Sequence, residues 1–544
     1  MAAPDLPLAE RTLGKVLAAS VRRAPDKLFL AHRERRLTYR AFDRLSDRVA
    51  NALAGLGLAR GGRIGLMVPN SIEFVAPLFG AAKLGAIYVP INLDYKGDIL
   101  AYQLAKAEVT HMVIDARYLD RLAAVQGELP GLTHVIVRRE AGIEAPPARF
   151  DARLVLVEYD QLERGEERPV TVEVDFRDPL AISFTSGTTG PSKGVLATHC
   201  HVLTFSLDWI EANAYGQDDV LYTPLPLFHA IATWLGILPT AIVGASAHIA
   251  DRFSASRFWD EARACDATVV HGIFAIVPML LKQPPSPLDR QHRVRLFYIG
   301  QQNDEFEARF GCRVVEVYGA TETGIVTYTP LDQPRRKGSC GRANDRSYEV
   351  KVVDEADNEC PPGTPGEIVV RPRQPFSMMR EYYNMPAETV AAFRNLWFHT
   401  GDSGRRDAEG YFYFVDRKKD AMRRRGENIS SFELESVFYK HPKVMECAAI
   451  AVPSPLGEDE VKIVVVPREG EAVTAAELWD FCRELMPAFW VPRFIEFRAA
   501  LPKTPNQKVQ KYLLRQGVDQ GEVFEDPQAG KAGGQAVGDR RRAG

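Results

Sequence analysis

The sequence has few cysteines, almost no net charge and no long uninterrupted apolar run. Its seven cysteines are scattered over 544 residues and form no C-x-x-C pair, which argues against a zinc site or a disulfide framework. The formal net charge of −3 gives no reason to expect a nucleic-acid partner. The most apolar stretch, residues 230–250, is broken by Gly, Pro and His, so we expect no membrane span. Together these features favour a reducing, cytoplasmic setting.

The two ends of the chain predict neither a secretory signal nor a packed C-terminal tail. The opening segment MAAPDLPLAERTLGKV lacks the apolar core of a secretory signal. Residues 519–544 are rich in Gly, Ala, Gln and Arg without apolar periodicity, so they predict a disordered tail. A functional basic tail is the alternative interpretation.

The length and the order of apolar runs predict several domains of α/β type. Single cores stop growing near ~250–300 residues, so a chain of this length holds more than one. Short buried runs alternate with helix-length segments, which favours a parallel sheet; the strand candidates are 63–68, 86–90, 110–114, 268–274, 294–300 and 313–318. Residues 345–416 change to short strands with turn residues and predict a small β-rich part. We place the N-terminal domain at 1–416 and an α+β C-terminal domain at 417–518.

The most informative segment joins an apolar strand to a loop of glycines, hydroxyls and one lysine, Ala181-Ile-Ser-Phe-Thr-Ser-Gly-Thr-Thr-Gly-Pro-Ser-Lys-Gly-Val195. Glycines let backbone N–H groups approach phosphate oxygens, hydroxyls donate to them, and Lys193 supplies a positive charge. The lysine lies between Ser192 and Gly194, so this is not the G-x-x-x-x-G-K-[ST] loop of P-loop NTPases. The pattern predicts polyphosphate binding, with a flexible surface loop as the alternative.

The loop S-G-T-T-G-x-x-K-G resembles the signature of the adenylate-forming superfamily, which contains acyl-CoA synthetases, adenylation domains of peptide synthetases and luciferases. The resemblance covers about residues 10–515 and extends to ligases of the carnitine and crotonobetaine type. It implies a large AMP- and acyl-binding domain of stacked αβ sheets with a small β subdomain, followed by a mobile C-terminal domain. It also implies ATP and Mg²⁺ as cofactors, with the nucleotide held by Thr185, Ser186, Gly187, Thr188, Thr189, Gly190 and Lys193.

Two later segments carry residue types that suit a nucleotide. Tyr318-Gly-Ala-Thr-Glu-Thr-Gly324 resembles the Y-G-x-T-E motif of the superfamily. The resemblance implies that Tyr318 and Gly319 contact the base, that Thr321 donates to the α-phosphate and that Glu322 holds Mg²⁺. His399-Thr-Gly-Asp402 resembles the T-G-D motif, in which Asp402 accepts from the ribose hydroxyls. Gly300 is assigned to the nucleotide site on the same grounds; alone, T-G-D is typical of a turn.

The C-terminal motifs imply a hinge and a catalytic lysine. Asp416-Arg-Lys-Lys-Asp420 resembles the family hinge, with Arg417 on ribose or phosphate and Lys419 as the pivot; a solvated linker is the alternative. Leu501-Pro-Lys-Thr-Pro-Asn-Gln-Lys-Val509 resembles the late lysine motif, in which Lys508 offsets the negative charge where a carboxylate attacks the α-phosphate. The preceding residue is usually Gly and here is Gln507, which leaves Lys503 and Lys511 as alternatives.

The acid and thiol sites are less specifically marked. Pro224-Leu-Pro-Leu-Phe-His-Ala230 resembles the segment that lines the acyl pocket, so His229 is expected near the substrate carboxylate, with a core histidine as the alternative. Trp234, Gly324 and Ile325 are expected wall positions. The polar residues Gln301-Gln302-Asn303 depart from the family pattern and favour a small or polar acid.

These features predict an ATP-dependent ligase that forms an acyl-adenylate and passes the acyl group to coenzyme A. In the resemblance, Gly426 lines the pantetheine path, and Arg423, Arg424 and Arg425 could meet CoA phosphates. Three alternatives stay open: transfer of the adenylate to a carrier protein, its transfer to an amine or other nitrogen nucleophile, and activation of an inorganic oxyacid, nitrite, as in ATP-dependent diazotases. A non-catalytic binding protein with the same fold is the rival from another class, and a homodimer is a further expectation.

Overall fold

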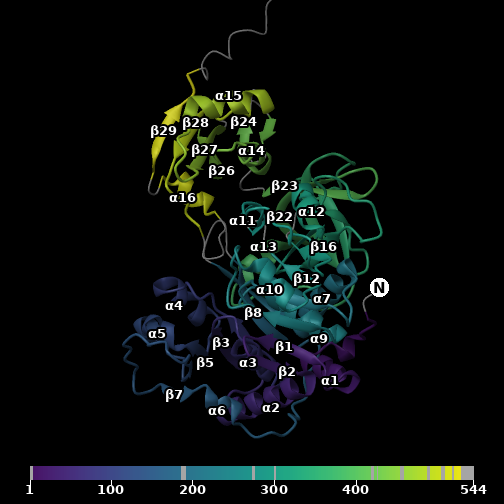
Figure 1. Ribbon diagram of the computed structural model, residues 1–544, viewed down its shortest axis with the longest axis vertical. Coiled ribbons are helices and arrows are strands. Elements are labelled where there is room, and N and C mark those ends of the chain that lie inside the picture. Colours follow the sequence, from purple (N-terminus) through teal and green to yellow (C-terminus); the bar gives the residue numbers. More distant parts are fainter. Residues whose placement is uncertain are drawn as a thin grey trace, which may run out of the picture.

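The fold was analysed in a computed structural model (Figure 1), which describes residues 4–185, 192–272, 276–298, 302–417, 422–424, 427–429, 431–453, 459–486, 490–503, 509–517 and 520–527. The two αβ sheets occupy the lower part of the view, the β-rich sheet lies above them, and the small C-terminal unit is at the top. This arrangement confirms the α/β fold class predicted from the sequence.

The first αβ sheet is parallel except at one edge. Its order is β14 (Arg313–Val315), β13 (Leu296–Tyr298), β12 (Val269–His271), β10 (Val220–Thr223), β11 (Ser246–Ile249), β1 (Leu28–His32) and β2 (Arg35–Thr38). Strand β1 comes from the start of the chain and pairs with β11 more than two hundred residues later. The sequence pattern did not indicate this long-range pairing, because both strands are short apolar runs with no partner-specific feature.

The second αβ sheet carries the phosphate-loop segment. Its order is β20 (Glu381–Tyr382), β9 (Lys193–Thr198), β8 (Pro179–Thr185), β4 (Ile87–Pro90), β3 (Arg63–Met67), β5 (His111–Asp115), β6 (His134–Arg138) and β7 (Val155–Glu158). The strands β8 to β7 run parallel, whereas β9 and β20 are antiparallel additions. Because parallel strands end at one edge, the loops that follow β3, β4, β5 and β8 share that edge.

Helices cover the two αβ sheets and bury an apolar core between them. The longer ones are α1 (Leu13–Arg23), α2 (Tyr39–Gly55), α3 (Ile72–Lys83), α4 (Gly97–Lys106) and α7 (His199–Asn213). The shorter ones are α5 (Leu119–Val125), α6 (Asp160–Glu163), α8 (Ala230–Ala232), α9 (Leu238–Val243), α10 (Phe258–Ala264), α11 (Ile276–Leu281), α12 (Asp304–Phe310) and α13 (Pro386–Ala392). None of the helices in the described part of the chain is long and apolar enough to cross a bilayer.

The β-rich sheet begins earlier than residue 345, where the sequence texture placed it. It contains β15 (Val317–Ala320), β16 (Gly324–Tyr328), β17 (Gly341–Ala343), β23 (Tyr411–Arg417), β22 (Trp397–Arg406), β19 (Gly366–Pro372) and β18 (Tyr348–Val353), with β21 (Phe393–Arg394) paired to β22. The run predicted as one strand at 313–318 is divided at Glu316: β14 joins the first αβ sheet and β15 joins this one.

The C-terminal unit is an α+β arrangement that contacts the β-rich part through α14 (Ser431–Phe438) and β23. Its sheet has the order β26 (Val444–Pro453), β27 (Asp459–Pro467), β28 (Phe494–Phe497) and β29 (Glu522–Glu525), beside the hairpin β24 (Met422–Arg424) and β25 (Glu427–Ile429). Helices α15 (Ala475–Leu485) and α16 (Lys511–Arg515) complete it. The tail predicted for 519–544 is therefore wrong at its start, because residues 522–525 pair with β28. Residues 528–544 lie outside the described part, and the domain boundaries stay a prediction.

Candidate active site

The phosphate loop is anchored by two adjacent antiparallel strands. Strand β8 ends at Thr185 and β9 begins at Lys193, and these two residues are directly opposite each other in the register. The carbonyl oxygen of Ser192 accepts a hydrogen bond of 3.1 Å from the hydroxyl of Tyr102 on α4. The predicted binding residues Ser186, Gly187, Thr188, Thr189 and Gly190 lie outside the described residues, so the structure fixes the two ends of the loop.

The Y-G-A-T-E segment forms a tight β-hairpin between β15 and β16. The backbone N–H of Ala320 donates to Oγ1 of Thr323 at 3.2 Å and closes the turn that carries Thr321 and Glu322. A Cβ at Gly319 would overlap the carbonyl oxygen of Gly324, so only glycine fits this close approach of the two strands. Close packing of the two hairpin strands therefore explains why a glycine occupies the predicted turn position.

Glu322 and the two ends of the phosphate loop meet in one cluster. The hydroxyl of Thr185 donates to Oε1 of Glu322 at 3.4 Å, and the hydroxyl of Tyr382 donates to the same oxygen at 3.1 Å. The Nζ of Lys193 lies 4.6 Å from the centre of the Tyr382 ring, within the range of a cation–π interaction. Burial and the nearby Glu322 charge raise the pKa of Tyr382, which keeps its phenol protonated as a donor.

The cluster offers a site for one divalent cation bound mainly through substrate oxygens. The two hydrogen bonds that described residues donate to the Glu322 side chain both reach Oε1, and Oε2 is the oxygen that would reach a metal. Among the described residues, no group of three or more His, Cys, Asp or Glu side chains is arranged to hold a metal ion. Mg²⁺ is usually bound by one or two carboxylates together with phosphates and waters, so a single carboxylate beside a phosphate loop fits it.

Tyr318 and Asp402 connect the two predicted nucleotide motifs. The Tyr318 hydroxyl donates to Oδ2 of Asp402 at 2.8 Å. Burial and the Asp402 charge raise the pKa of Tyr318, so the phenol stays protonated. Asp402 lies within β22, directly across from Arg417 at the end of β23. The structure thus brings together three residues that were predicted at the nucleotide from separate motifs.

Several other predicted residues cannot be placed. Those outside the described part of the chain are Gly300, Lys419, Gly426 and Lys508. The two alternatives to Lys508 are described, and both have ion-pair partners. Lys503 pairs with Glu446, and the Nζ of Lys511 lies 2.8 Å from Glu435 and donates to Ser431 at 2.6 Å. Lys503 and Val509 also form a β-bridge that frames the segment containing Lys508.

The predicted acyl-pocket segment leads from β10 into a short irregular helix. His229 precedes α8, and a π-helical turn, Thr233–Ile237, follows it. The π-turn carries Trp234, whose indole N–H donates to the hydroxyl of Tyr88. The Trp234 ring lies 6.1 Å from that of Phe205 on α7, and a Cβ at Gly324 would lie 3.6 Å from the same Phe205 ring. The predicted wall positions Trp234 and Gly324 therefore meet around Phe205.

A buried histidine adjoins this group and was not predicted. The His201 ring lies 5.9 Å from the Trp234 ring and is fully buried, and neither of its nitrogens has a hydrogen-bond partner among the described residues. Burial lowers the pKa of His201 to about 3, so the imidazole is neutral near pH 7. Its neighbours in the sequence, Cys200 and Val202, gave no pattern that would have marked it.

Part of the polar run after β13 caps the start of helix α12. The side chain of Asn303 accepts from the N–H of Phe306 at 2.8 Å and caps α12. The side-chain nitrogen Nε2 of Gln302 donates to Oδ1 of Asp304 at 2.6 Å. The cap accounts for the side-chain oxygen of Asn303, and the expectation that this polar run favours a small or polar acid stays a prediction. Gln301 lies outside the described residues.

Comparisons with known proteins cover most of the chain. The family model described as AMP-binding enzyme matches residues 17–383, and the one described as AMP-binding enzyme C-terminal domain matches 433–508. The crotonobetaine/carnitine–CoA ligase of Salmonella agona (strain SL483) is 34% identical over 492 residues, which is 88% of this chain and 93% of the relative.

Two solved structures are similar in fold along nearly their whole length. The anthranilate CoA ligase AuaEII, in complex with anthranoyl-AMP, matches with a TM-score of 0.83 at 27% identity over 95% of this chain and 99% of the other. ATP-bound MatB from Rhodopseudomonas palustris matches with a TM-score of 0.82 at 28% identity over 93% and 98% of the two chains.

Proposed function

The chain belongs to the AMP-binding enzyme family, and we propose that it is an ATP-dependent, AMP-forming acid–CoA ligase whose acid is small or polar. The observation that carries the proposal is the cluster of Thr185, Lys193, Glu322 and Tyr382, in which both ends of the phosphate loop meet a carboxylate. A phosphate loop closed onto a carboxylate suits a triphosphate with its bound Mg²⁺.

In the first half-reaction, the acid's carboxylate oxygen attacks the α-phosphorus of ATP, and the bond to pyrophosphate breaks. Thr185, the loop residues 186–190 and Lys193 would hold the β- and γ-phosphates, and Thr321 would donate to the α-phosphate. Glu322 would hold Mg²⁺, which supplies charge neutralisation when bound. Tyr318, Asp402 and Arg417 would contact the nucleoside, since Asp402 and Arg417 are opposite each other in the sheet.

The cation that joins acid and nucleotide is proposed to be Lys508. The attack brings the negative carboxylate toward a negative phosphate, so a mobile ammonium lowers the barrier. Lys503 and Lys511 are less suited to this task, because each is already held by a carboxylate within the C-terminal unit. A lysine fixed in an ion pair would have to break that pair before it could reach a substrate.

The acid is proposed to bind beside His229, Phe205 and Trp234. Trp234 and Phe205 are bulky and buried, which limits the length of an acyl chain. The neutral imidazole of His201 adds a polar group to the same surroundings. Two of the similar proteins support a compact polar acid by their names, which are those of a crotonobetaine/carnitine–CoA ligase and an anthranilate CoA ligase.

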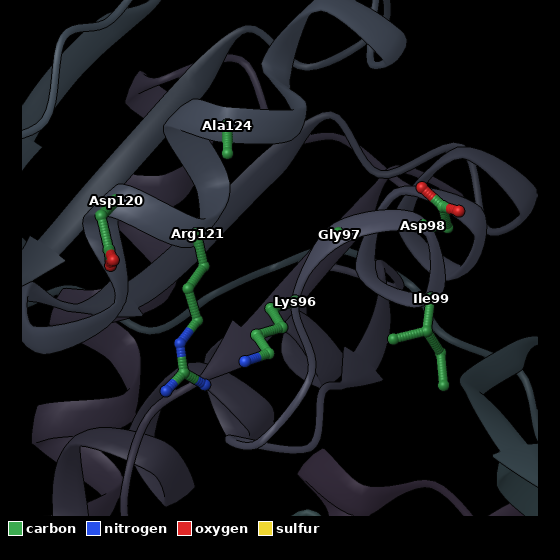
Figure 2. A pocket seen from close by; sticks show the side chains of 7 residues that line it. All are labelled: Lys96, Gly97, Asp98, Ile99, Asp120, Arg121 and Ala124. Carbon is green, nitrogen blue, oxygen red and sulfur yellow. The ribbon is translucent and has the colours of Figure 1, made fainter.

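In the second half-reaction, the CoA thiol attacks the acyl carbon and AMP leaves. We propose that the C-terminal unit turns about Lys419 for this step, with Gly426 beside the pantetheine. Figure 2 shows an open hollow between the starts of α4 and α5, where Lys96 and Arg121 extend toward one another. Asp98 and Asp120 also border the hollow, so its lining carries two acids and two cations (Figure 2). We propose that Lys96 and Arg121, which extend toward one another, bind the phosphates of CoA.

The proposal is tested by a pyrophosphate-release screen with a panel of small carboxylic acids, run with and without CoA. The expected result is acid-dependent release of pyrophosphate, with AMP and the acyl-thioester formed when CoA is present. A carrier protein or an amine as the required acceptor would redirect the second half-reaction, and nitrite as the activated oxyacid would redirect the first. Absence of any ATP-dependent AMP release over the whole panel would contradict the proposal and favour a binding protein.

A further inference from the structure

Asn70 ties together the two αβ sheets at the entrance to the acyl segment. It follows β3 of the second sheet and precedes α3, and its side chain is buried. Its Nδ2 donates to the carbonyl oxygens of Leu225 and Ala250, each at 2.9 Å, and its Oδ1 accepts from the N–H of Leu227 at 2.8 Å. Leu225 and Leu227 follow β10, and Ala250 follows β11, so all three partners lie in segments that leave strands of the other sheet.

These hydrogen bonds hold the backbone on both sides of Pro226. The carbonyl before the proline and the N–H after it are both bound to one carboxamide, which fixes the direction of the chain at this point. The next turn is closed by the N–H of His229, which donates to the Pro226 carbonyl at 3.0 Å. The carbonyl of His229 in turn accepts from Ala232 at 3.0 Å, which starts α8. Asn70 therefore fixes the backbone around Pro226, and the hydrogen bond from His229 to the Pro226 carbonyl fixes His229 relative to that backbone.

We propose that Asn70 is a positioning residue for the acid site, acting through the backbone that presents His229. This inference rests on the proposed function, in which His229 lies beside the acid. An asparagine is suited to the position because it supplies two donors and one acceptor at once, and all three are used. Aspartate has nearly the same shape but lacks the two donors, so it would face two carbonyl oxygens with a negative charge.

The surroundings of Asn70 make an aspartate tolerable for folding. A cavity of about 230 Å³ borders Asn70 and is lined also by four arginines, Arg33, Arg117, Arg138 and Arg252. Glu140 and Asp251 lie on the same cavity, so the arginines outnumber the acids of the lining. Arg33 is already paired with Glu140 and Asp251, and Arg117 and Arg138 are paired with Asp115, so the lining keeps a small excess of positive charge. We expect this excess to reduce the cost of a carboxylate at position 70, while its contacts to Leu225 and Ala250 are lost. Asn70→Asp separates the loss of positioning from a loss of the fold.

The matched control is Asn51 on α2. Its Nδ2 also donates to two backbone carbonyls, those of Glu166 at 2.8 Å and Arg168 at 2.9 Å, and these partners are remote in the chain from the acyl segment. Asn51→Asp removes the same two donors from an exposed place. We expect Asn70→Asp to lower kcat/KM for the acid by about tenfold or more, with the KM for ATP changed by less than about twofold. Asn51→Asp should leave both values unchanged.

A double-mutant cycle with His229→Ala shows whether Asn70 acts through His229. If it does, Asn70→Asp has a much smaller effect on kcat/KM for the acid when His229 is already alanine, because the two changes remove one shared contribution. Equal effects in both backgrounds would overturn the proposal, and so would equal increases in the KM values for acid and ATP. Melting temperatures are measured for every variant, and Asn70→Ser replaces the aspartate if that variant does not fold.

Failure of this inference can be told apart from failure of the proposed function. If the unmodified protein shows no acid-dependent release of AMP, the proposed function is wrong, and the inference is overturned with it. If the unmodified protein is active and Asn70→Asp matches Asn51→Asp in every kinetic value, Asn70 has only a structural role. The proposed function would stand in that second case.

Discussion

The hydroxyl of Tyr382 donates to Oε1 of Glu322 at 3.1 Å, and its ring lies below the ammonium of Lys193. One side chain from the short edge strand β20 therefore contacts both a predicted metal-binding carboxylate and the lysine that ends the phosphate loop. Strand β20 pairs with β9 over Val195 and Leu196, which places Tyr382 beside the loop. We interpret Tyr382 as the residue that orients Glu322 toward a cation.

Replacing Tyr382 by Phe should weaken the response to Mg²⁺. A hydrogen bond to a charged group contributes about 1.5–3 kcal/mol, so we expect the Mg²⁺ concentration at half-maximal rate to rise about tenfold. The measurement is the rate of acid-dependent AMP formation against Mg²⁺ concentration. The control is Tyr383→Phe, which removes the neighbouring phenol that donates to Glu108 at 2.6 Å. An unchanged Mg²⁺ response in Tyr382→Phe would show that the contact does not serve metal binding.

Replacing Gly319 by Ala should destabilise the hairpin of the Y-G-A-T-E segment. The added Cβ would overlap the carbonyl oxygen of Gly324, and a backbone atom cannot move aside without separating β15 from β16. We expect a loss of about 3 kcal/mol, read as a fall of several degrees in the apparent melting temperature. Gly131→Ala is the control, because nothing lies within 4 Å of a Cβ there. Equal melting temperatures for the two variants would contradict the packing argument.

The sequence was sufficient to predict the class of fold and many of its elements. The strands at 63–68, 86–90 and 110–114 correspond to β3, β4 and β5 within one or two residues, because buried parallel strands are continuous apolar runs. Glu316 marks where local patterns failed: the chain leaves one sheet and enters another within a single apolar run. The pairing of β29 was missed because Glu522–Glu525 is a short run with only two apolar residues, and its strand structure depends on pairing with β28.

The candidate site was predictable where short motifs carry the chemistry and not where distant segments supply support. Glu322 and Asp402 were found from their motifs, and the structure places each beside a tyrosine, Tyr382 and Tyr318 respectively. Tyr382 was missed, since a tyrosine in a short polar segment has no signal of its own. Asn70 was missed as well, because its proposed role depends on three backbone groups that lie more than 150 residues away in the sequence.

Removing the cations of the hollow in Figure 2 should affect the thiol step alone. The variant Lys96→Ala with Arg121→Ala is expected to raise the KM for CoA by about a hundredfold or more, because each of the two charge-assisted hydrogen bonds to a phosphate is worth about 1.5–3 kcal/mol. Pyrophosphate release measured without CoA should not change. Arg139→Ala is the control, since this exposed arginine pairs with Glu158 at the far edge of the sheet. An unchanged KM for CoA would exclude the hollow as the phosphate site.

The buried His201 should make the protein less stable in acid. Its folded pKa of about 3 lies below the ordinary value of 6.5, so between these pH values the unfolded chain binds more protons than the folded one. Stability therefore falls as pH drops below about 6.5, by roughly 1.4 kcal/mol per pH unit for this group. His201→Gln lacks this contribution, so the difference in melting temperature between the two proteins should narrow from pH 7 to pH 5.

The carboxyl of Asp208 contributes with the opposite sign, because burial raises its pKa to about 7. Its protonated form is favoured in the folded state, so stability from this group falls as pH rises from about 4 to 7. Asp208 is present in both proteins of the comparison and cancels from the difference. A constant gap in melting temperature across the pH range would contradict the assignment to His201.

The most direct test of the account is the exchange of labelled pyrophosphate into ATP, measured with the acid and without CoA. An acyl-adenylate formed before the thiol step predicts acid-dependent exchange in the unmodified protein, almost complete loss of it in Lys508→Ala, and its retention in Lys503→Ala. Exchange that required CoA, or that survived unchanged in Lys508→Ala, would contradict the account.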